Sequence, residues 1–269
     1  MIKKITKKIP GDYDIWMCLF VFTLIIVGVL VWVGIVILVN LSQPEFGYRL
    51  IANNTEISLT RYRRYGSEVQ IPTHIHNLPV TTIEDELFAR SRRTGQFGRT
   101  CECGRYFRGR ITCATIPYGI THIGGMAFFA NRLTTITLPD SITHIGGSAF
   151  AENELTYVTI PNTITTIYGG VFRSNRLTTV TIPDSVTHIR QAAFLNNRLT
   201  TVTIPDNVTY IGRRAFESNQ LTNVTIPGSV TYIGEYAFRN NYLTSIIVPY
   251  HTILGVHVFD SHVTVIRKN

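Results

Sequence analysis

The sequence repeats one unit of 22 residues, and a clear copy reads Leu177-Thr178-Thr179-Val180-Thr181-Ile182-Pro183, then Ser185-Val186-Thr187-His188-Ile189, then Ala193-Phe194 and Asn197. The closing phenylalanine recurs at a constant step, at Phe128, Phe150, Phe172, Phe194, Phe216 and Phe238. A fixed period between about 20 and 50 residues is typical of solenoids, in which each unit contacts only its neighbours. The sequence therefore predicts a repeat array.

Within one unit, apolar residues alternate at the end of the segment Leu-x-x-Ile-x-Ile-Pro, as expected of a strand with one buried face. Proline ends that strand because it has no N–H group for a neighbouring ladder. An asparagine precedes each strand, and a short polar side chain there can bond turn groups of adjacent coils. A unit this small cannot bury its own apolar face, so stacking must create the core.

The full pattern Leu-x-x-Ile-x-Ile-Pro-x-x-Val-x-x-Ile-Gly-x-x-Ala-Phe-x-x-Asn resembles the BspA-like (Tp-type) leucine-rich repeat, closely from about residue 111 to 260. The resemblance implies a parallel β-solenoid, of α/β or mainly β class, with one main strand per turn. It also implies a bacterial or protist surface protein that serves in adhesion or protein binding, without catalysis.

The N-terminal region predicts a membrane anchor. Residues 1–14 form a basic leader, and residues 15–39 carry no charge. A helix of that length spans about 37 Å, enough for the hydrocarbon core of a bilayer. A cleaved secretory signal is the alternative, but its apolar region would be shorter and followed by a cleavage site. Lysines precede the segment, so we expect a cytoplasmic N-terminus and an extracytoplasmic solenoid.

We expect five further regions: a linker at 40–47, an N-terminal β cap with the first repeat at 48–89, an insertion loop rich in arginine and cysteine at 90–110, the leucine-rich repeats at 111–250 and a C-terminal cap at 251–269. A cap covers the open end of a solenoid and its unpaired strand edge.

The insertion lengthens the step from Phe88 to the next core phenylalanine, Phe128, to 40 residues. It holds seven arginines and one acid, within a chain of net charge +8. Insertions in solenoids form loops, where function concentrates. We therefore predict that the loop steers an acidic partner, through Arg92, Arg93, Arg105 and Arg108.

The cysteines outside the apolar segment are Cys101, Cys103 and Cys113. In an extracytoplasmic domain they favour one disulfide, between Cys113 and either Cys101 or Cys103. Free thiols are the alternative. The spacing fits no common zinc pattern, so we expect no metal.

The outward positions of the predicted strands are mostly threonine. Threonine is a good strand former, which can account for these columns without any ligand. The alternative is a binding face, with candidate contacts Tyr157, Thr179, Thr201 and Asn223. Tyrosine is enriched in binding hot spots, so Tyr157 is the first choice. A second column, which includes His122, His144 and His188, predicts a ladder of stacked rings rather than a metal or pH sensor.

No nucleophile elbow, zinc-protease motif or phosphate-binding loop is present, so we expect no enzyme activity and no cofactor. Nucleic acid is disfavoured because the domain is predicted to lie outside the cytoplasm. The predicted function is recognition of a protein or glycan by the strand face and the basic loop. The alternative is a self-associating scaffold of the cell envelope, possible as a homo-oligomer.

Overall fold

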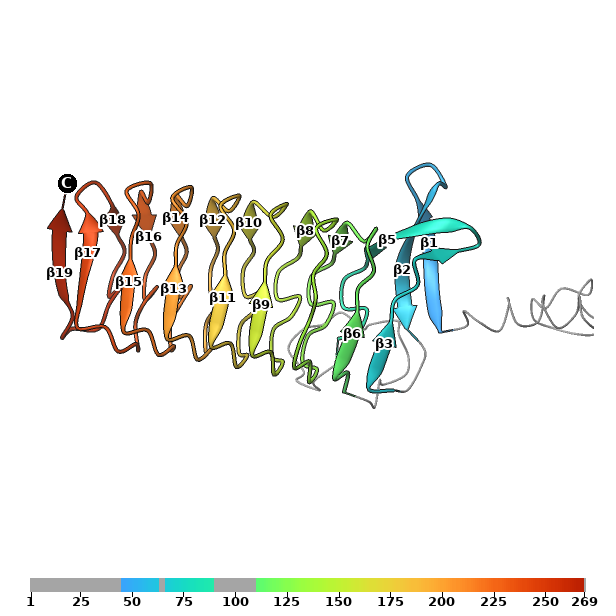
Figure 1. Ribbon diagram of the computed structural model, residues 1–269, viewed down its shortest axis with the longest axis horizontal. Coiled ribbons are helices and arrows are strands. Elements are labelled where there is room, and N and C mark those ends of the chain that lie inside the picture. The colour runs from blue at the N-terminus through green and yellow to red at the C-terminus, as the bar shows by residue number, and fades with distance from the viewer. Residues whose placement is uncertain (1–44, 63–65, 90–109, 269) are drawn as a thin grey trace, which may run out of the picture. The chain divides into compact units, whose positions relative to one another are not determined.

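The computed structural model describes residues 45–62, 66–89 and 110–268, which form a stack of coils (Figure 1). These residues contain strands and turns without a helix, so the class is mainly β. The predicted leader, the transmembrane segment at 15–39 and most of the insertion loop lie outside the described residues. Within the described ranges, no helix is long and apolar enough to cross a bilayer.

Each regular coil contributes to two strand columns, where the resemblance predicted one main strand per turn. The main column comprises β3 (Glu68–Gln70), β6 (Cys113–Thr115), β9 (Tyr157–Thr159), β11 (Thr179–Thr181), β13 (Thr201–Thr203), β15 (Asn223–Thr225), β17 (Ser245–Pro249) and β19 (Thr264–Lys268). The short column comprises β7 (His122–Ile123), β8 (His144–Ile145), β10 (Thr166–Ile167), β12 (His188–Ile189), β14 (Tyr210–Ile211), β16 (Tyr232–Ile233) and β18 (Ile253–Leu254). The main strand is present in most coils, and a second strand of two residues is added because the two residues after each Val-Thr or Ile-Thr pair also bond to the next coil.

Pairing is more continuous in the short column than in the main one. The main strands pair only two by two, in parallel, as β3 with β6, β9 with β11, β13 with β15 and β17 with β19. The coil that contains Thr135 and Thr137 forms no strand there. The short strands form two longer sheets, of which one ends at β8 and the other begins at β10. The short column is therefore the main hydrogen-bonded wall of the solenoid.

The first described coil starts with an antiparallel hairpin. β1 (Phe46–Ile51) pairs with β2 (Glu56–Tyr62), and β2 pairs in parallel with β5 (Leu78–Ile83). β4 (His74–Ile75) is antiparallel to β5. β1 begins at Phe46, within the region expected to be linker, because that side chain is buried against the rings of Tyr62 and Phe88.

The core is a stack of phenylalanine rings with leucine, isoleucine and valine around it. Phe88 lies 4.8 Å from Phe128, and Phe128 lies 5.3 Å from Phe150, measured between ring centroids. The stack continues at 5.3–5.8 Å to Phe259. These separations suit offset stacking of aromatic rings and exceed the strand spacing of about 4.8 Å only slightly. One ring per coil thus sets the spacing of the array from inside.

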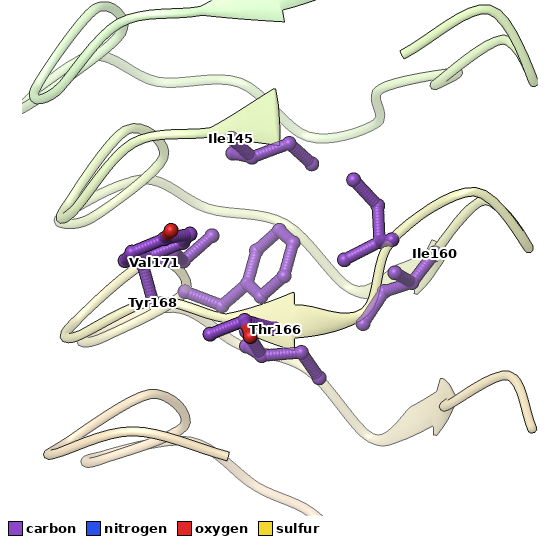
Figure 2. A pocket seen from close by; sticks show the side chains of 8 residues that line it. Ile145, Ile160, Thr166, Tyr168 and Val171 are labelled. Carbon is purple, nitrogen blue, oxygen red and sulfur yellow. The ribbon is translucent and has the colours of Figure 1, made fainter. Parts of the chain in front are cut away.

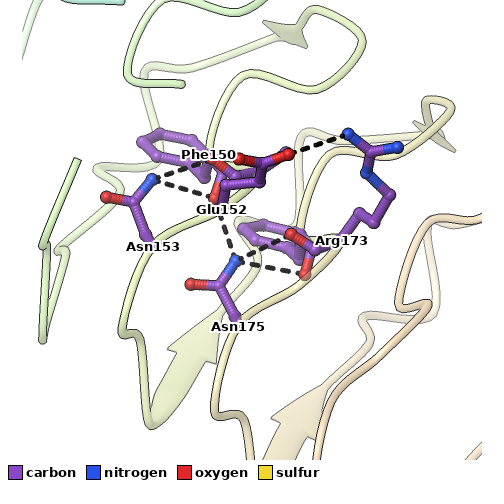
Figure 3. Close-up of polar contacts among 7 residues, drawn as sticks. Phe150, Glu152, Asn153, Arg173 and Asn175 are labelled. Atoms are coloured by element: carbon purple, nitrogen blue, oxygen red, sulfur yellow. Dashed lines mark hydrogen bonds and ion pairs between the residues drawn. The ribbon is translucent and has the colours of Figure 1, made fainter. Parts of the chain in front are cut away.

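A ladder of buried asparagines holds the coils together at the turn that follows each core phenylalanine (Figure 3). The Nδ2 group of Asn153 donates to Phe128 O of the preceding coil at 2.9 Å and to Phe150 O of its own coil at 3.1 Å. Its Oδ1 atom accepts from Leu133 N at 3.0 Å. The same pattern recurs at Asn131, Asn175, Asn197, Asn219 and Asn241. The expected bonding of turn groups is present, directed toward the preceding coil.

Candidate functional site

The strand face is the outward surface of the main column, and its side chains are exposed on every coil. Residues on either side of one inward residue point outward, as at Thr201 and Thr203 around the buried Val202. Parallel register places equivalent positions in line, so that Thr179 lies beside Tyr157 and Thr201 beside Asn223. The four predicted contacts of this face therefore occupy one column, and all four are exposed.

Tyr157 differs from its neighbours in the column in size and in carrying an aromatic ring. Half of its surface, 53%, is accessible, and its column neighbour is a threonine. An amphipathic ring on a surface of short hydroxyl side chains offers a large contact area with little loss of side-chain entropy. The face combines a single aromatic anchor in this column with hydroxyl and amide groups that donate or accept hydrogen bonds.

Charges border the strand face on both sides. On the side where each strand begins, Glu154 pairs with Arg176 at 3.2 Å and with Arg132 at 3.9 Å. Arg198, in the next coil, is exposed and has no ion pair among the described residues. On the side where each strand ends, Asp140, Asp184 and Asp206 are exposed. From the coil of Thr135 to the coil of Ser245, the face is therefore an uncharged strip between a mixed basic edge and an acidic edge, whereas the terminal strands carry Glu68 on β3 and Lys268 on β19.

The insertion leaves the solenoid at the basic edge. Asn131 bonds the residues that flank both ends of the insertion. The Nδ2 group of Asn131 donates to Phe88 O at 2.8 Å, and its Oδ1 atom accepts from Ile111 N at 3.1 Å. Across the insertion, β3 still pairs with β6. The arginines predicted to steer a partner, Arg92, Arg93, Arg105 and Arg108, lie outside the described residues, as do Cys101 and Cys103. Cys113 is exposed on β6 beside Glu68, and its predicted disulfide stays a prediction.

A ladder of rings follows the short column. His122 stacks on His144 with ring centroids 5.8 Å apart, and Tyr210 stacks on Tyr232 at 5.3 Å. Thr166 interrupts the column in the sequence. The ring of Tyr168, two residues later, lies 4.9 Å from His144 and was missed because its position in the repeat normally holds glycine.

The pKa of His144 is lowered within this ladder. Burial lowers the pKa of His144 from its ordinary value of 6.5, the neighbouring His122 lowers the pKa further, and Asp85 raises it. The described part of the chain brings together no group of three His, Cys, Asp or Glu side chains that could hold a metal ion. Burial in the ladder thus makes His144 harder to protonate than an ordinary histidine.

The repeats match the family model described as the BspA type leucine rich repeat region, with six copies, over residues 106–221 and 144–266. The chain belongs to the BspA-type leucine-rich repeat family. Tyr157, Thr179, Thr201 and Asn223 all lie within the matched BspA-type region, whereas Arg92, Arg93 and Arg105 precede it. The strand face is thus built by the family repeat, and most of the basic loop is an addition to it.

Solved structures share the fold of this BspA-type protein at low sequence identity. A leucine-rich cell surface protein of Faecalibacterium prausnitzii is 24% identical with a TM-score of 0.53, covering 84% of this chain and 76% of that chain. A leucine-rich repeat protein of Bacteroides ovatus is 20% identical with a TM-score of 0.55, covering 83% and 66%. The pneumococcal vaccine antigen PcpA is 18% identical with a TM-score of 0.58, covering 80% and 66%. A comparison with curated proteins found no match.

Proposed function

We propose that this protein is a non-catalytic recognition module of the cell surface or envelope, which binds a protein or glycan on its strand face. The observation that carries the proposal is the strip of exposed hydroxyl, amide and aromatic side chains on a repeated, pre-formed column of strands. A pre-formed surface loses little conformational entropy on binding, so modest contacts suffice. The predicted anchor at 15–39 and the cell-surface protein among the structural relatives support the location.

The basic loop has a separate role in this proposal. Arg92, Arg93, Arg105 and Arg108 attract an acidic ligand and raise its association rate, while the strand face holds the bound ligand. Both ends of the loop emerge at the basic edge of the face, where Asn131 holds Phe88 and Ile111. A ligand steered by the loop therefore arrives beside the strand face.

The test is a screen of the full chain, in lipid nanodiscs, against arrays of glycans and extracellular matrix proteins. For any ligand found, Tyr157→Thr is expected to weaken binding about tenfold, because the substitution repeats the threonine of the neighbouring rung and removes only the ring. Tyr118→Thr is the matched control, since Tyr118 is 80% exposed but lies on a turn outside the strands. Equal effects of the two substitutions would contradict a role for the strand face.

Self-association is a second candidate, favoured by exposed aliphatic side chains on the coils from residue 245 onward. Ile247, Ile253, Val256 and Ile266 are between 47% and 65% exposed. Ile247 and Ile266 are paired neighbours on β17 and β19, and exposed aliphatic groups favour contact with another apolar surface. Sedimentation velocity would show an oligomer that the double variant Ile253→Thr/Val256→Thr dissociates. A monomer at micromolar concentration would rule this candidate out.

A further inference from the structure

One junction between coils differs from the others in the short column. In the described residues, seven junctions connect the strands from β5 to β18. At six of them, two backbone hydrogen bonds cross to the preceding coil, as from Thr187 N to Thr165 O at 2.9 Å and from Arg190 N to Ile167 O at 2.9 Å. Between β8 and β10, both counterparts are missing among the described bonds: Thr165 N to Thr143 O, and Tyr168 N to Ile145 O. We call this the β8/β10 junction.

The opposite side of the β8/β10 junction is intact. Phe150 N donates to Val171 O at 3.0 Å, and Asn175 Nδ2 donates to Phe150 O at 2.9 Å. The phenylalanine stack also continues, with Phe150 and Phe172 separated by 5.8 Å. Two further bonds flank the missing pair along the chain: Thr163 Oγ1 donates to Ile142 O, and Ser148 N donates to Gly169 O at 2.9 Å. The two coils are therefore bonded along the asparagine ladder, and the gap between them is confined to the two backbone bonds of the short strands.

The position of Tyr168 explains the missing bonds. Regular coils hold glycine there, and a Cβ atom on Gly146 would lie 2.4 Å from Gly125 N, while one on Gly212 would lie 2.6 Å from Gln191 N. Side chains at this position thus meet the backbone of the preceding coil. Arg190 occupies the same position and keeps its two bonds, so a Cβ atom alone can be accommodated. The feature that distinguishes Tyr168 is its ring, which packs 4.9 Å from His144 across the junction.

A small apolar pocket marks the opening (Figure 2). It is lined by Ile145 of β8, Thr166 of β10, Tyr168 and Val171, with Ile160 on the other side. Close-packed interiors leave few such gaps, because each lost contact reduces the dispersion energy of the lining atoms. The gap and the absent bonds coincide at the same pair of coils.

We propose that the Tyr168 ring is a wedge that keeps the β8/β10 junction open on one side and makes it the point at which the solenoid flexes. The asparagine ladder acts as the pivot, and the short strands separate. Tyr157 lies on the first main strand after the junction, so flexing changes its angle to the preceding coils. This inference concerns the array itself and does not depend on the proposed ligand.

The test is amide hydrogen exchange at single-residue resolution on the full chain. In the wild-type protein, the amides of Thr165 and Tyr168 are expected to exchange at least about tenfold faster than those of Thr187 and Arg190, their bonded counterparts. Phe150 N, on the pivot side, is expected to stay protected. In Tyr168→Gly, the amides at 165 and 168 are expected to become as slow as those of the next junction.

Tyr168→Phe is the control that keeps the ring, and it is expected to exchange like the wild type. Three results would overturn the proposal. Slow exchange at Thr165 in the wild type would mean that the ladder is closed. Unchanged fast exchange in Tyr168→Gly would mean that the ring is not the cause. Exchange at Phe150 as fast as at Thr165 would mean that the junction has no pivot.

Discussion

At the scale of single residues, each buried asparagine side chain hydrogen-bonds several backbone groups at once. Each amide bonds three or more backbone groups in two coils, and all lie among apolar side chains. A backbone group left without a partner in such a place costs about 1–3 kcal/mol. The asparagine side chain is short enough to reach both coils and offers donors and an acceptor together.

Asn175→Ala should lower the free energy of unfolding by about 3 kcal/mol, because Phe150 O and Leu155 N lose their bonds to the amide. Urea unfolding followed by circular dichroism measures the change. Asn162→Ala is the control: Asn162 is exposed, and its side chain makes none of the hydrogen bonds recorded among the described residues. A loss of similar size in both variants would contradict the ladder.

His144 should make the solenoid less stable in mild acid. Because its pKa is lower in the folded protein than the ordinary 6.5, the unfolded chain binds the proton more readily. Stability from this group is present above pH 6.5 and is lost as the pH falls from 6.5 toward the folded pKa. The midpoint of urea unfolding at pH 7.5 and pH 5.5 would show the loss.

His144→Tyr, which places in this coil the ring found at Tyr210, should reduce that pH dependence. His251→Tyr is the control, because His251 is an exposed histidine outside the ring ladder. If the pH dependence survives in His144→Tyr and falls in His251→Tyr, burial in the ladder is not its source.

At the scale of one coil, the glycine before the Ala-Phe pair sets how closely coils can approach. Gly146→Ala should lower the free energy of unfolding by about 1 kcal/mol, because the new methyl group would lie 2.4 Å from Gly125 N, and the backbone must shift to accommodate it, as it accommodates the Cβ atom of Arg190. Gly228→Ala should be near neutral, since a Cβ atom there has nothing within 4 Å. Thermal unfolding of the two variants measures the contrast. Similar melting temperatures would show that the coils separate easily at this position.

The repeat pattern predicted the period, the buried positions and the asparagine ladder, because each depends on contacts that recur in every coil. It did not predict the second strand, since two residues are too few to show an alternation. It also did not predict the left-handed backbone at Met126 or Tyr236, with φ of 54° and 58°. Residues other than glycine rarely adopt that backbone conformation, so only the packing of adjacent turns specifies it.

The candidate site also contains features that the sequence could predict and features that required the structure. The outward column of Tyr157, Thr179, Thr201 and Asn223 could be predicted because strand alternation fixes which side chains point outward. The charged edges required the structure, since the pairing of Glu154 with both Arg132 and Arg176 depends on contacts between coils. The break at Tyr168 required it as well, because Arg190 departs from glycine at the same position without a break.

At the scale of the whole molecule, the positive charge lies outside the solenoid. Residues 45–62, 66–89 and 110–268 contain 13 Lys and Arg against 14 Asp and Glu, although the chain carries +8. The excess belongs to the N-terminal leader, residues 63–65 and the insertion. Any attraction of the protein to anionic partners must therefore come from those segments rather than from the repeats.

Replacing Arg92, Arg93, Arg105 and Arg108 with serine should make the full chain elute from heparin-agarose at a clearly lower salt concentration, because salt screens the remaining charges more easily. The matched control replaces Lys3, Lys4, Lys7 and Lys8 with serine, which removes the same charge from the leader. A larger shift in the control would assign the attraction to the leader and not to the loop.

The direction of the asparagine ladder bears on how the protein is made. The carbonyl group of Phe128 is bonded by Asn153, 25 residues further along the chain, and this relation repeats through the array. During synthesis, each newly emerged coil must therefore wait for the following one before its turn is complete. We therefore expect the coils to fold in order from the N-terminal end during synthesis. Folding would lag behind chain elongation by about one repeat, so that one incompletely bonded coil is exposed at every stage.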